Sequence, residues 1–359
     1  MTTRISMTDK KNQHYIPKFY LRNFSYLKNK KQIGVFNIDN RLLVQRAKLK
    51  TQGSKNFFYG YDGIIEDNLA NIEGSLSKAI NEIIETRLIP KRNSERHLEL
   101  LSFVTLTDLR NPIKVQGFKN QMTEMKQNLL KLDPQVDVDK FVPNPTHEEI
   151  IKLLLSNSFE MINYISDLEY KLLINKSDKP FISSDFPIVK YNQFLEKANW
   201  KLSKSGYGTV GLQIFIPLNS ELILVFFDPG IYKVGCKKKK YLELNNHSDI
   251  DAINTLQFIN CFETVYFDEK ATDSYIRKIE SISKKFKRAN VTHSTLNHLI
   301  KKGECEKEIL RDKENLMVFG STDCEMKLEV TGIKIHNNGK HYRFNSSASQ
   351  LRKHCRNLR

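Results

Sequence analysis

A short segment near the N-terminus combines ionisable and aromatic residues in a pattern that suggests a site. Residues 13–24 read QHYIPKFYLRNF, so His14, Arg22 and Asn23 are interleaved with four aromatic rings. Pro17 fits the first turn of a helix, where its missing N–H costs nothing, and the rings after it would form a buried face beside Arg22. We therefore expect Arg22 to be fixed in place to bind a phosphate oxygen, with His14 as a general acid or base.

Two glutamates are predicted on the buried side of a helix. At about 100° per residue, Glu66 and Glu73 fall close to Leu69 on the helical wheel. A buried carboxylate without a partner is costly, and Arg110, at the end of an almost wholly apolar helix, is a candidate partner. Two interpretations stay open. Either Glu73 and Arg110 form a purely structural ion pair, or Arg110 and Arg22 bind phosphate while Glu73 orients one of them or holds a metal.

A third group of polar residues follows a buried strand. The sequence FISSDFPI at 181–188 places two hydroxyls and the carboxylate of Asp185 at the strand end. Sites of α/β proteins are often assembled there, and Asp185 would then act with Glu73 in orienting the arginines or binding Mg²⁺. The same residues also suit an ordinary β-turn with an Asx hydrogen bond.

The charge of the chain favours a polyanionic partner. Lysine and arginine number 57 against 41 acidic residues, a net charge of +16. Asp9 is the only acidic residue before Asp39, and none follows Gly339. Because cations bind nucleic acid by releasing counterions, nucleic acid is the expected partner, and a solvated basic surface without a specific ligand is the alternative. The C-terminal cations expected to contact nucleic acid are Lys340, Arg343, Arg352, Lys353 and Arg356.

Composition disfavours several classes of protein. Five cysteines without a Cys-x-x-Cys pair argue against a disulfide framework or a zinc site. The N-terminus lacks the apolar run of a signal peptide, and no stretch approaches the roughly 18 apolar residues of a membrane span. We expect a soluble, cytoplasmic protein without a membrane partner. The oligomeric state and the cofactor are left open, with Mg²⁺ as the one candidate.

Hydrophobic periodicity predicts an α+β fold. Apolar residues recur with helical spacing in the segments 64–88, 94–109, 113–132, 148–161, 248–262 and 272–285. Strand-like runs cover 32–38, 42–48, 170–175, 180–184, 211–218 and 221–227. We expect a small N-terminal β unit and a helical bundle packed on a central, mainly antiparallel sheet, with a C-terminal β-hairpin appendage. Asn338-Gly339, a pair typical of type I′ turns, predicts a hairpin between 330–336 and 341–344.

Four regions are expected along the chain. Residues 1–12 would form a disordered basic arm, and residues 301–359 a basic C-terminal β appendage. Between them, residues 13–135 would form a β-hairpin and helical subdomain, and residues 146–300 a sheet-and-helix subdomain. A polar, proline-containing connection separates these two larger regions.

Weaker motifs match nuclease patterns. Residues 92–97 and 288–293 fit the Arg-x4-His pattern of HEPN ribonucleases, but Arg92 falls outside the predicted helix. Glu169 and Lys171 form half of a metal-dependent nuclease motif, which chance produces easily in a chain with 27% charged residues. Neither pattern identifies a reaction by itself.

Motifs spread along the chain together resemble the bacterial domain-of-unknown-function family 4238. In chain order they are 14–24, Phe58-Tyr59, Glu66 to Glu73, 103–112, 183–187, 215–218 and Asn254, within about residues 12–275. The resemblance implies a shared fold and a place among bacterial defence genes, but names no reaction. It also implies a shared site, made of His14, Arg22, Glu73, Arg110 and Asp185. The chain departs from the family pattern at Thr107, where a Gln is expected, and in its basic tail.

These features favour a nucleic-acid-processing enzyme, namely a nuclease in an antiphage defence or toxin setting. Two alternatives stay open. One is a non-catalytic module that binds nucleic acid or a phage component, and the other is an enzyme acting on a nucleotide or another small phosphorylated ligand. The catalytic hypotheses require the distant residues of the shared site to converge in space.

Overall fold

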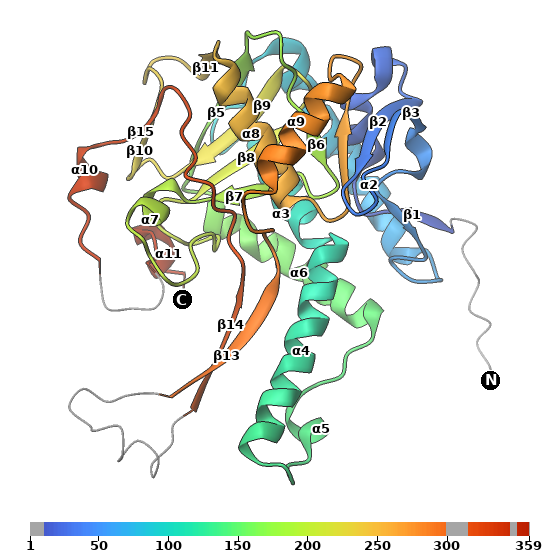
Figure 1. The fold of residues 1–359 in the computed structure, drawn as a ribbon, viewed down its shortest axis with the longest axis vertical. Coiled ribbons are helices and arrows are strands. Elements are labelled where there is room, and N and C mark those ends of the chain that lie inside the picture. The colour runs from blue at the N-terminus through green and yellow to red at the C-terminus, as the bar shows by residue number, and fades with distance from the viewer. Residues whose placement is uncertain (1–10, 299–314, 345–349, 359) are drawn as a thin grey trace.

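Two larger β-sheets covered by helices form the body of the computed structural model, which describes residues 11–298, 315–344 and 350–358 (Figure 1). The five-stranded sheet has the order β11 (Tyr241–Leu244), β5 (Glu169–Asn175), β9 (Leu222–Phe227), β8 (Gln213–Pro217) and β7 (Val189–Tyr191). Its β11–β5 pair is parallel and its other pairs are antiparallel. The predicted α+β class with a mainly antiparallel sheet is confirmed.

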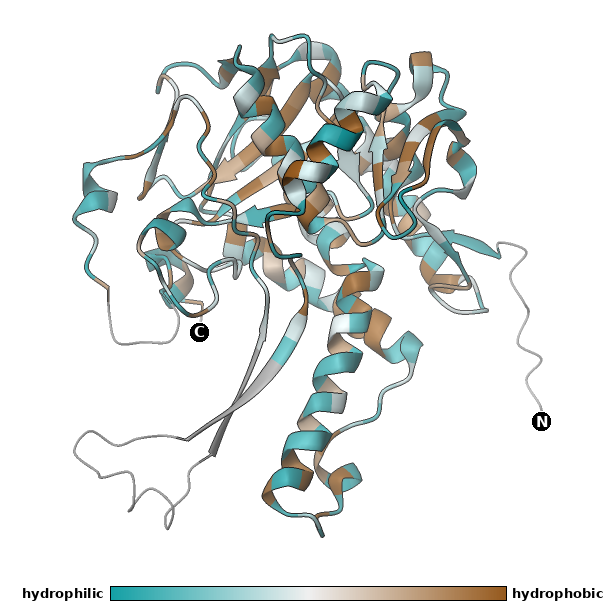
Figure 2. Ribbon diagram, in the orientation of Figure 1, coloured by the Kyte–Doolittle hydropathy of each residue, from teal (hydrophilic) through white to brown (hydrophobic). Residues whose placement is uncertain are grey.

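Both faces of the five-stranded sheet are buried. On β9, Leu222, Leu224 and Phe226 pack on one hydrophobic cluster, while the alternate residues pack on another, because successive side chains of a strand point to opposite faces. The first cluster includes residues of α2 (Ile64–Thr86), α3 (Glu95–Leu109) and α6 (His147–Ile165). The second includes residues of α7 (Gln193–Lys197), α8 (His247–Asn260) and the C-terminal segment. Figure 2 shows the hydrophobic residues concentrated on the strands and on the helix faces that cover them.

The four-stranded sheet joins the N-terminal β unit to the later part of the chain. Its order is β3 (Leu43–Lys48), β2 (Gln32–Asn37), β12 (Thr264–Phe267) and β6 (Ser183–Ser184). Gly34 of β2 lies so close to β12 that a Cβ there would meet the Phe267 ring at 2.3 Å, so only glycine fits. The helix α9 (Asp273–Ser283) packs on α8 beside this sheet. Strands from both predicted subdomains thus share one sheet.

Capping residues set the ends of the predicted helices close to the expected positions. Ser94 accepts the His97 N–H at 3.2 Å at the start of α3, and Asn111 accepts the Ile113 N–H at 3.2 Å at the start of α4 (Pro112–Leu132). A single-turn helix, α5 (Val138–Phe141), follows α4. The hairpin of β13 (Thr292–His298) and β14 (Asn315–Ser321) projects from the body beside α4 (Figure 1).

The hairpin predicted around Asn338-Gly339 is wrong. Residues Asn337–Lys340 form the single-turn helix α10, in which the His336 ring accepts the Asn338 N–H at 3.0 Å. The preceding strand β15 (Ile333–Ile335) pairs with β10 (Tyr232–Val234) and not with residues 341–344. Gly339 is required for packing, because a Cβ there would lie 2.8 Å from the Ile335 side chain. The C-terminal hairpin is instead β13–β14.

The ends of the chain pack against the body where they are described. Residues 1–10 of the predicted arm lie outside the described residues, but β1 (Asn12–His14) pairs with β4 (Ser54–Asn56). At the other end, the Val210 N–H donates to the Gln350 carbonyl at 2.7 Å, and α11 (Lys353–Arg356) follows. Residues 350–358 of the basic appendage therefore lie along the body, whereas β14 projects from it.

Candidate functional site

Backbone and side-chain hydrogen bonds hold the N-terminal segment in a fixed position. The Gln13 amide donates to the Gly60 carbonyl at 2.9 Å and accepts the Tyr59 N–H at 2.5 Å. Pro17 is the N-cap residue that precedes α1 (Lys18–Leu21), one position before the predicted first turn, and the buried Tyr20 hydroxyl donates to the Pro217 carbonyl at 2.6 Å. These bonds tie the segment to the core on both sides of His14.

His14 is a buried, neutral histidine with one ring nitrogen left over. Only 6% of the residue is exposed, and its Nε2 lies 3.2 Å from the Lys50 carbonyl oxygen. Burial, and then the charge of Lys18, lower the pKa of His14 to about 4. The carbonyl contact assigns the ring hydrogen to Nε2. The lone pair of Nδ1 is then the free acceptor, because no described residue hydrogen-bonds to this atom.

Glu73 of α2 and Arg110 of α3 form an ion pair. The Arg110 Nη1 lies 2.8 Å from the Glu73 Oε1, and Arg110 is fully buried. The ion pair predicted between these two residues is therefore present in the structure. However, the Nε and Nη2 atoms of Arg110 have no hydrogen-bond partner among the described residues. The electrostatic influence of Arg110 also reaches the Tyr59 hydroxyl, which donates to the His14 carbonyl at 3.1 Å.

A pocket of about 230 Å³ brings these groups together. It is lined by His14, Lys18, Glu66, Leu69, Ala70 and Glu73, and we call it the His14 pocket. The N-terminal segment thus faces α2, whose two predicted carboxylates both reach the pocket wall. Of the predicted site, the structure brings together His14, Glu73 and, through the ion pair, Arg110.

Arg22 does not join the His14 pocket but lines a groove beside it. The side chain is exposed, so the expectation that aromatic packing fixes it is wrong. The groove has a volume of about 400 Å³. It is lined by Lys18, Arg22, Lys30, Lys31, Lys48, Leu49 and Lys50, and we call it the basic groove. None of its six cations forms a salt bridge with an acidic residue in the described part of the chain.

The basic groove adjoins the His14 pocket. Lys18 lines both, and the backbone carbonyl of Lys50 contacts the His14 ring. The groove residues come from α1, β3 and the short helices η1 (Arg22–Phe24) and η3 (Leu49–Thr51), with residues 30 and 31 between them. The sequence did not single out its lysines, although one signal was present: Asp39 is the only acidic residue between Lys10 and Asp62.

Asp185 lies outside the His14 pocket and binds backbone instead. Its Oδ1 accepts the Phe262 N–H at 2.6 Å, and its Oδ2 accepts the N–H groups of Glu263 and Thr264 at 2.7 and 2.9 Å. Burial raises the pKa of Asp185 to about 7, against the opposing effect of these hydrogen bonds. The Asn111 amide donates to the Asp185 carbonyl at 2.6 Å. Asp185 thus fixes the turn between α8 and β12, next to the helix start that follows Arg110.

The predicted C-terminal cations divide into one buried arginine and four exposed residues. Arg352 is only 4% exposed, and its Nε lies 2.8 Å from Asp167 Oδ2, so the expectation of a surface contact to nucleic acid is wrong for this residue. Its guanidinium also donates to the Thr209 carbonyl at 2.8 Å. The exposed residues are Lys340, Arg343, Lys353 and Arg356. None of them lines the His14 pocket or the basic groove.

The Arg-x4-His matches are engaged in structural contacts. Arg92 donates to the Ser166 carbonyl at 2.7 Å, while His97 is buried and stacks on Tyr170 with ring centroids 5.0 Å apart. Arg288 donates to the carbonyls of residues 258 and 261. Lys171 of the half-motif donates to the Val234 carbonyl at 2.7 Å. These contacts give structural roles to Arg92, Arg288 and Lys171, whereas the Nε2 of His97 has no hydrogen-bond partner among the described residues.

A buried charged cluster around Asp108 was not predicted from the sequence. This fully buried carboxylate accepts from Lys190 at 2.9 Å and from the Tyr207 hydroxyl at 2.5 Å, and Lys114 lies 3.9 Å away. Burial lowers the pKa of Lys114 to about 8, although Asp108 raises it. The signal available in the sequence was Asp108 itself, a charged residue within an otherwise apolar helix that needs a partner. The cluster neutralises its own acid and ties α3 to β7.

Comparisons with known proteins identify one relationship. A family model described as a protein of unknown function, DUF4238, matches residues 12–271. Searches of curated proteins and of solved structures found no match. The matched range contains the His14 pocket, the basic groove and Asp185, whereas the predicted C-terminal cations lie outside it.

The described residues contain neither a candidate membrane span nor a candidate metal-ligand cluster. No helix within them is both long and apolar enough to cross a bilayer. No three His, Cys, Asp or Glu side chains within them are grouped as ligands of a metal ion.

Proposed function

We propose that this chain, which belongs to the DUF4238 family, is a nucleic-acid-processing enzyme that cleaves phosphodiester bonds at the His14 pocket. The observation that carries the proposal is the basic groove, whose six cations adjoin a pocket lined by a neutral histidine and by Glu73, the ion-pair partner of the buried Arg110. Six cations without acidic partners in one groove are the arrangement expected for binding a chain of phosphates.

The basic groove supplies binding without base recognition. All six of its cations are exposed and can each neutralise a phosphate. Neutralisation releases counterions from the nucleic acid, which drives association and makes it steeply dependent on salt. Lys18, which lines both cavities, would hold a phosphate at the entrance of the His14 pocket.

The His14 pocket offers the groups that hydrolysis needs. Neutral His14 can take a proton from a water molecule through Nδ1 as the water oxygen attacks phosphorus. The P–O ester bond then breaks, the leaving alkoxide takes a proton from solvent water to become a hydroxyl, and protonated His14 returns its proton to solvent. Arg110, held by Glu73, would stabilise the charge that develops on the phosphate oxygens. The carboxylates of Glu66 and Glu73 are of the type that binds Mg²⁺ together with water and phosphate oxygens.

The direct test is a cleavage assay with the His14→Ala protein. Labelled single-stranded RNA, single-stranded DNA and duplex DNA are incubated with the full chain, with Mg²⁺ and separately with EDTA. We expect His14→Ala to lower the cleavage rate at least about 100-fold, as loss of a general base does. His341→Ala, which changes an exposed histidine, serves as the matched control and should cleave like the wild type. Unchanged cleavage by His14→Ala would overturn the proposal.

A non-catalytic binding module is the second candidate, and one observation favours it. Glu73 is already engaged by Arg110 at 2.8 Å, so the pocket carboxylate is partly neutralised before any ligand arrives. A module would bind all three substrates through the basic groove and cleave none of them. The wild-type arms of the assay therefore separate the two candidates.

A further inference from the structure

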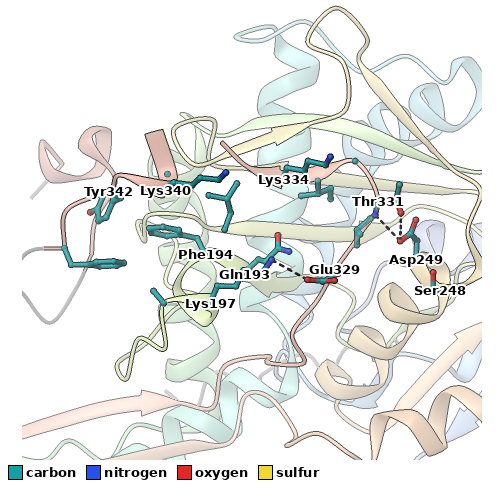
Figure 3. Close-up of a pocket in the computed structure, with 17 residues that line it drawn as sticks. Gln193, Phe194, Lys197, Ser248, Asp249, Glu329, Thr331, Lys334, Lys340 and Tyr342 are labelled. Atoms are coloured by element: carbon teal, nitrogen blue, oxygen red, sulfur yellow. Dashed lines mark hydrogen bonds and ion pairs between the residues drawn. The ribbon is translucent and has the colours of Figure 1, made fainter. Parts of the chain in front are cut away.

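A second cavity, of about 1160 Å³, lies on the opposite side of the body from β1 (Figures 1 and 3). Its walls are α7, the first turn of α8 and the segment 329–344. That last segment lies beyond residues 12–271, the range that matches the family model. The cavity is therefore built partly by the portion of this chain that the family match does not cover.

One end of the cavity is aromatic. The rings of Phe194 and Phe344 are stacked with their centroids 5.6 Å apart and an interplanar angle of 9°. Tyr342 meets the Phe194 ring edge-on at 5.5 Å, and its hydroxyl is buried without a hydrogen-bond partner among the described residues. Phe344 remains 42% exposed. Of the two stacked rings, only Phe344 is exposed, since Phe194 is 6% exposed, and an exposed aromatic ring is a platform for planar ligands such as nucleobases.

Two lysines line one long side of the cavity. Figure 3 shows Lys334 and Lys340 along the same wall, between the aromatic end and Asp249. Both are exposed, and neither forms a salt bridge with an acidic residue in the described segments. Lys197 on the other wall already faces Glu329 at 3.6 Å. The Lys334 wall therefore offers two free cations to an anionic group.

The far end of the cavity holds a carboxylate with one oxygen unused. Asp249 is only 3% exposed, and its Oδ1 accepts the Thr331 N–H at 3.0 Å (Figure 3). Its Oδ2 is buried and has no partner among the described residues. A buried acceptor without a donor is costly, so a ligand that presents a hydroxyl or an amine there would be favoured.

We propose that this cavity binds a nucleotide. The exposed Phe344 ring would stack on the base, Lys334 and Lys340 would bind the phosphates, and Asp249, which lies beyond the lysines, would accept from a hydroxyl of a group carried by the terminal phosphate. A base-free polyanion would leave the Phe344 ring and Asp249 unused, and an apolar ligand would leave the lysines and Asp249 unused. The site is separate from the His14 pocket and stands whether or not that pocket is catalytic.

The chain carries its own reporter for this site. Trp200 is the only tryptophan of the 359 residues, and its ring stacks on Phe344 at a centroid distance of 5.6 Å. A base that stacks on Phe344 would change the fluorescence of Trp200, whereas a polyanion bound in the basic groove would not. The readout is therefore specific to the cavity.

The test is a titration of the full chain followed by Trp200 fluorescence. ATP, GTP, CTP and UTP are titrated separately, and the base-free probe tripolyphosphate and the phosphate-free probe adenosine are measured by competition with a bound nucleotide. We expect saturable binding of at least one nucleotide, and at least about tenfold weaker binding of tripolyphosphate and of adenosine. Lys334→Ala/Lys340→Ala should weaken the nucleotide about tenfold or more, because two phosphate contacts are lost.

Matched controls separate the site from a general effect of charge. Lys119→Ala/Lys152→Ala removes the same charge from exposed lysines that do not line the cavity, and it should bind the nucleotide like the wild type. Tyr342→Phe removes only the unpartnered hydroxyl and tests the aromatic end without a loss of volume. The proposal is overturned if none of the four nucleotides gives a saturable change, if tripolyphosphate binds as tightly, or if both double variants behave alike.

Discussion

Arg110 and Glu73 form a 2.8 Å ion pair that joins α3 to α2 at the wall of the His14 pocket. The two partners differ in environment, because the arginine is fully buried whereas 24% of the Glu73 side chain is exposed. The guanidinium therefore depends on Glu73 for its nearest counter-charge, while two of its nitrogens remain without a partner among the described residues. The ion pair can stabilise the core while the Nε and Nη2 groups of Arg110 remain available as hydrogen-bond donors to an anion.

Removing the carboxylate of this pair should destabilise the fold. In Glu73→Gln the Arg110 charge stays buried without its counter-ion, so we expect a loss of about 2–3 kcal/mol in the free energy of unfolding, less than for a fully buried pair. Urea unfolding measures it. Glu82→Gln, which breaks the exposed Arg96–Glu82 pair, is the control, and it should change stability by no more than about 0.5 kcal/mol. Equal losses in the two proteins would contradict the prediction.

The neutral state of His14 should make stability fall in mild acid. Burial and Lys18 lower its pKa to about 4 in the folded chain, against about 6.5 when unfolded, so the unfolded state takes up the proton first as pH falls. The contribution of neutral His14 is fully present above about pH 6.5 and is lost as pH falls toward about 4. Relative to His14→Gln, the wild type should lose up to about 1 kcal/mol per pH unit in this window.

Urea unfolding of both proteins at about pH 7, 5.5 and 4.5 measures this difference. His341→Gln removes an exposed histidine and should run parallel to the wild type. Parallel curves for wild type and His14→Gln would show that His14 titrates normally and would remove the support for a neutral base.

Asp185 should behave as a structural acceptor. Asp185→Asn replaces one oxygen by an amide that faces a backbone N–H of residues 262–264, so we expect a loss of about 2–3 kcal/mol in stability. Asp133→Asn, which alters an exposed aspartate that accepts one backbone N–H, is the control and should cost less than about 1 kcal/mol. Thermal or urea unfolding tests both, and an unchanged stability of Asp185→Asn would refute the structural role.

The basic groove should set the salt dependence of nucleic-acid binding. Lys48→Ala/Lys50→Ala keeps the Lys50 carbonyl that contacts His14 but removes two groove cations. The slope of log K against log salt for single-stranded RNA should fall by about 1.4, since each lost phosphate contact contributes about 0.7. Fluorescence anisotropy between about 50 and 200 mM salt measures the slope. Lys119→Ala/Lys152→Ala should leave it unchanged, and an equal fall in both proteins would rule out the groove as the specific contact.

Two neighbouring C-terminal cations should contribute unequally to stability. Arg352→Met leaves the half-buried Asp167 carboxylate without its partner, and we expect a loss of about 3 kcal/mol. Lys353→Met changes an exposed side chain and should stay within about 0.5 kcal/mol. Unfolding measurements distinguish them, and a neutral Arg352→Met would restore the view of Arg352 as a surface residue.

Local patterns in the sequence predicted most of the secondary structure. The apolar spacing around Leu69 and Leu76 defined α2, and Ser94 and Asn111 marked two helix starts through their capping side chains. The hairpin predicted at Asn338-Gly339 was wrong because the turn preference of this pair is a local tendency of modest energy. Pairing of β15 with β10 and the packing of Gly339 against Ile335 outweighed it.

The candidate site was predicted in part. The sequence could indicate that Glu73 and Arg110 each need a partner, because a lone buried charge is costly wherever it lies. It could not show that Arg22 is exposed or that Asp185 accepts three backbone N–H groups, since both depend on which distant segment packs beside them.

By itself, the sequence determined the α+β class, the helix boundaries and the excess of cations without nearby acids, because periodicity, capping and charge are properties of residues close together in the chain. Only the tertiary structure decided which cations are free. It buried Arg352 against Asp167, paired Arg110 with Glu73 and gathered the lysines of the basic groove beside His14. The physical reason is that burial and charge pairing depend on long-range packing of strands and helices, which local sequence patterns do not encode.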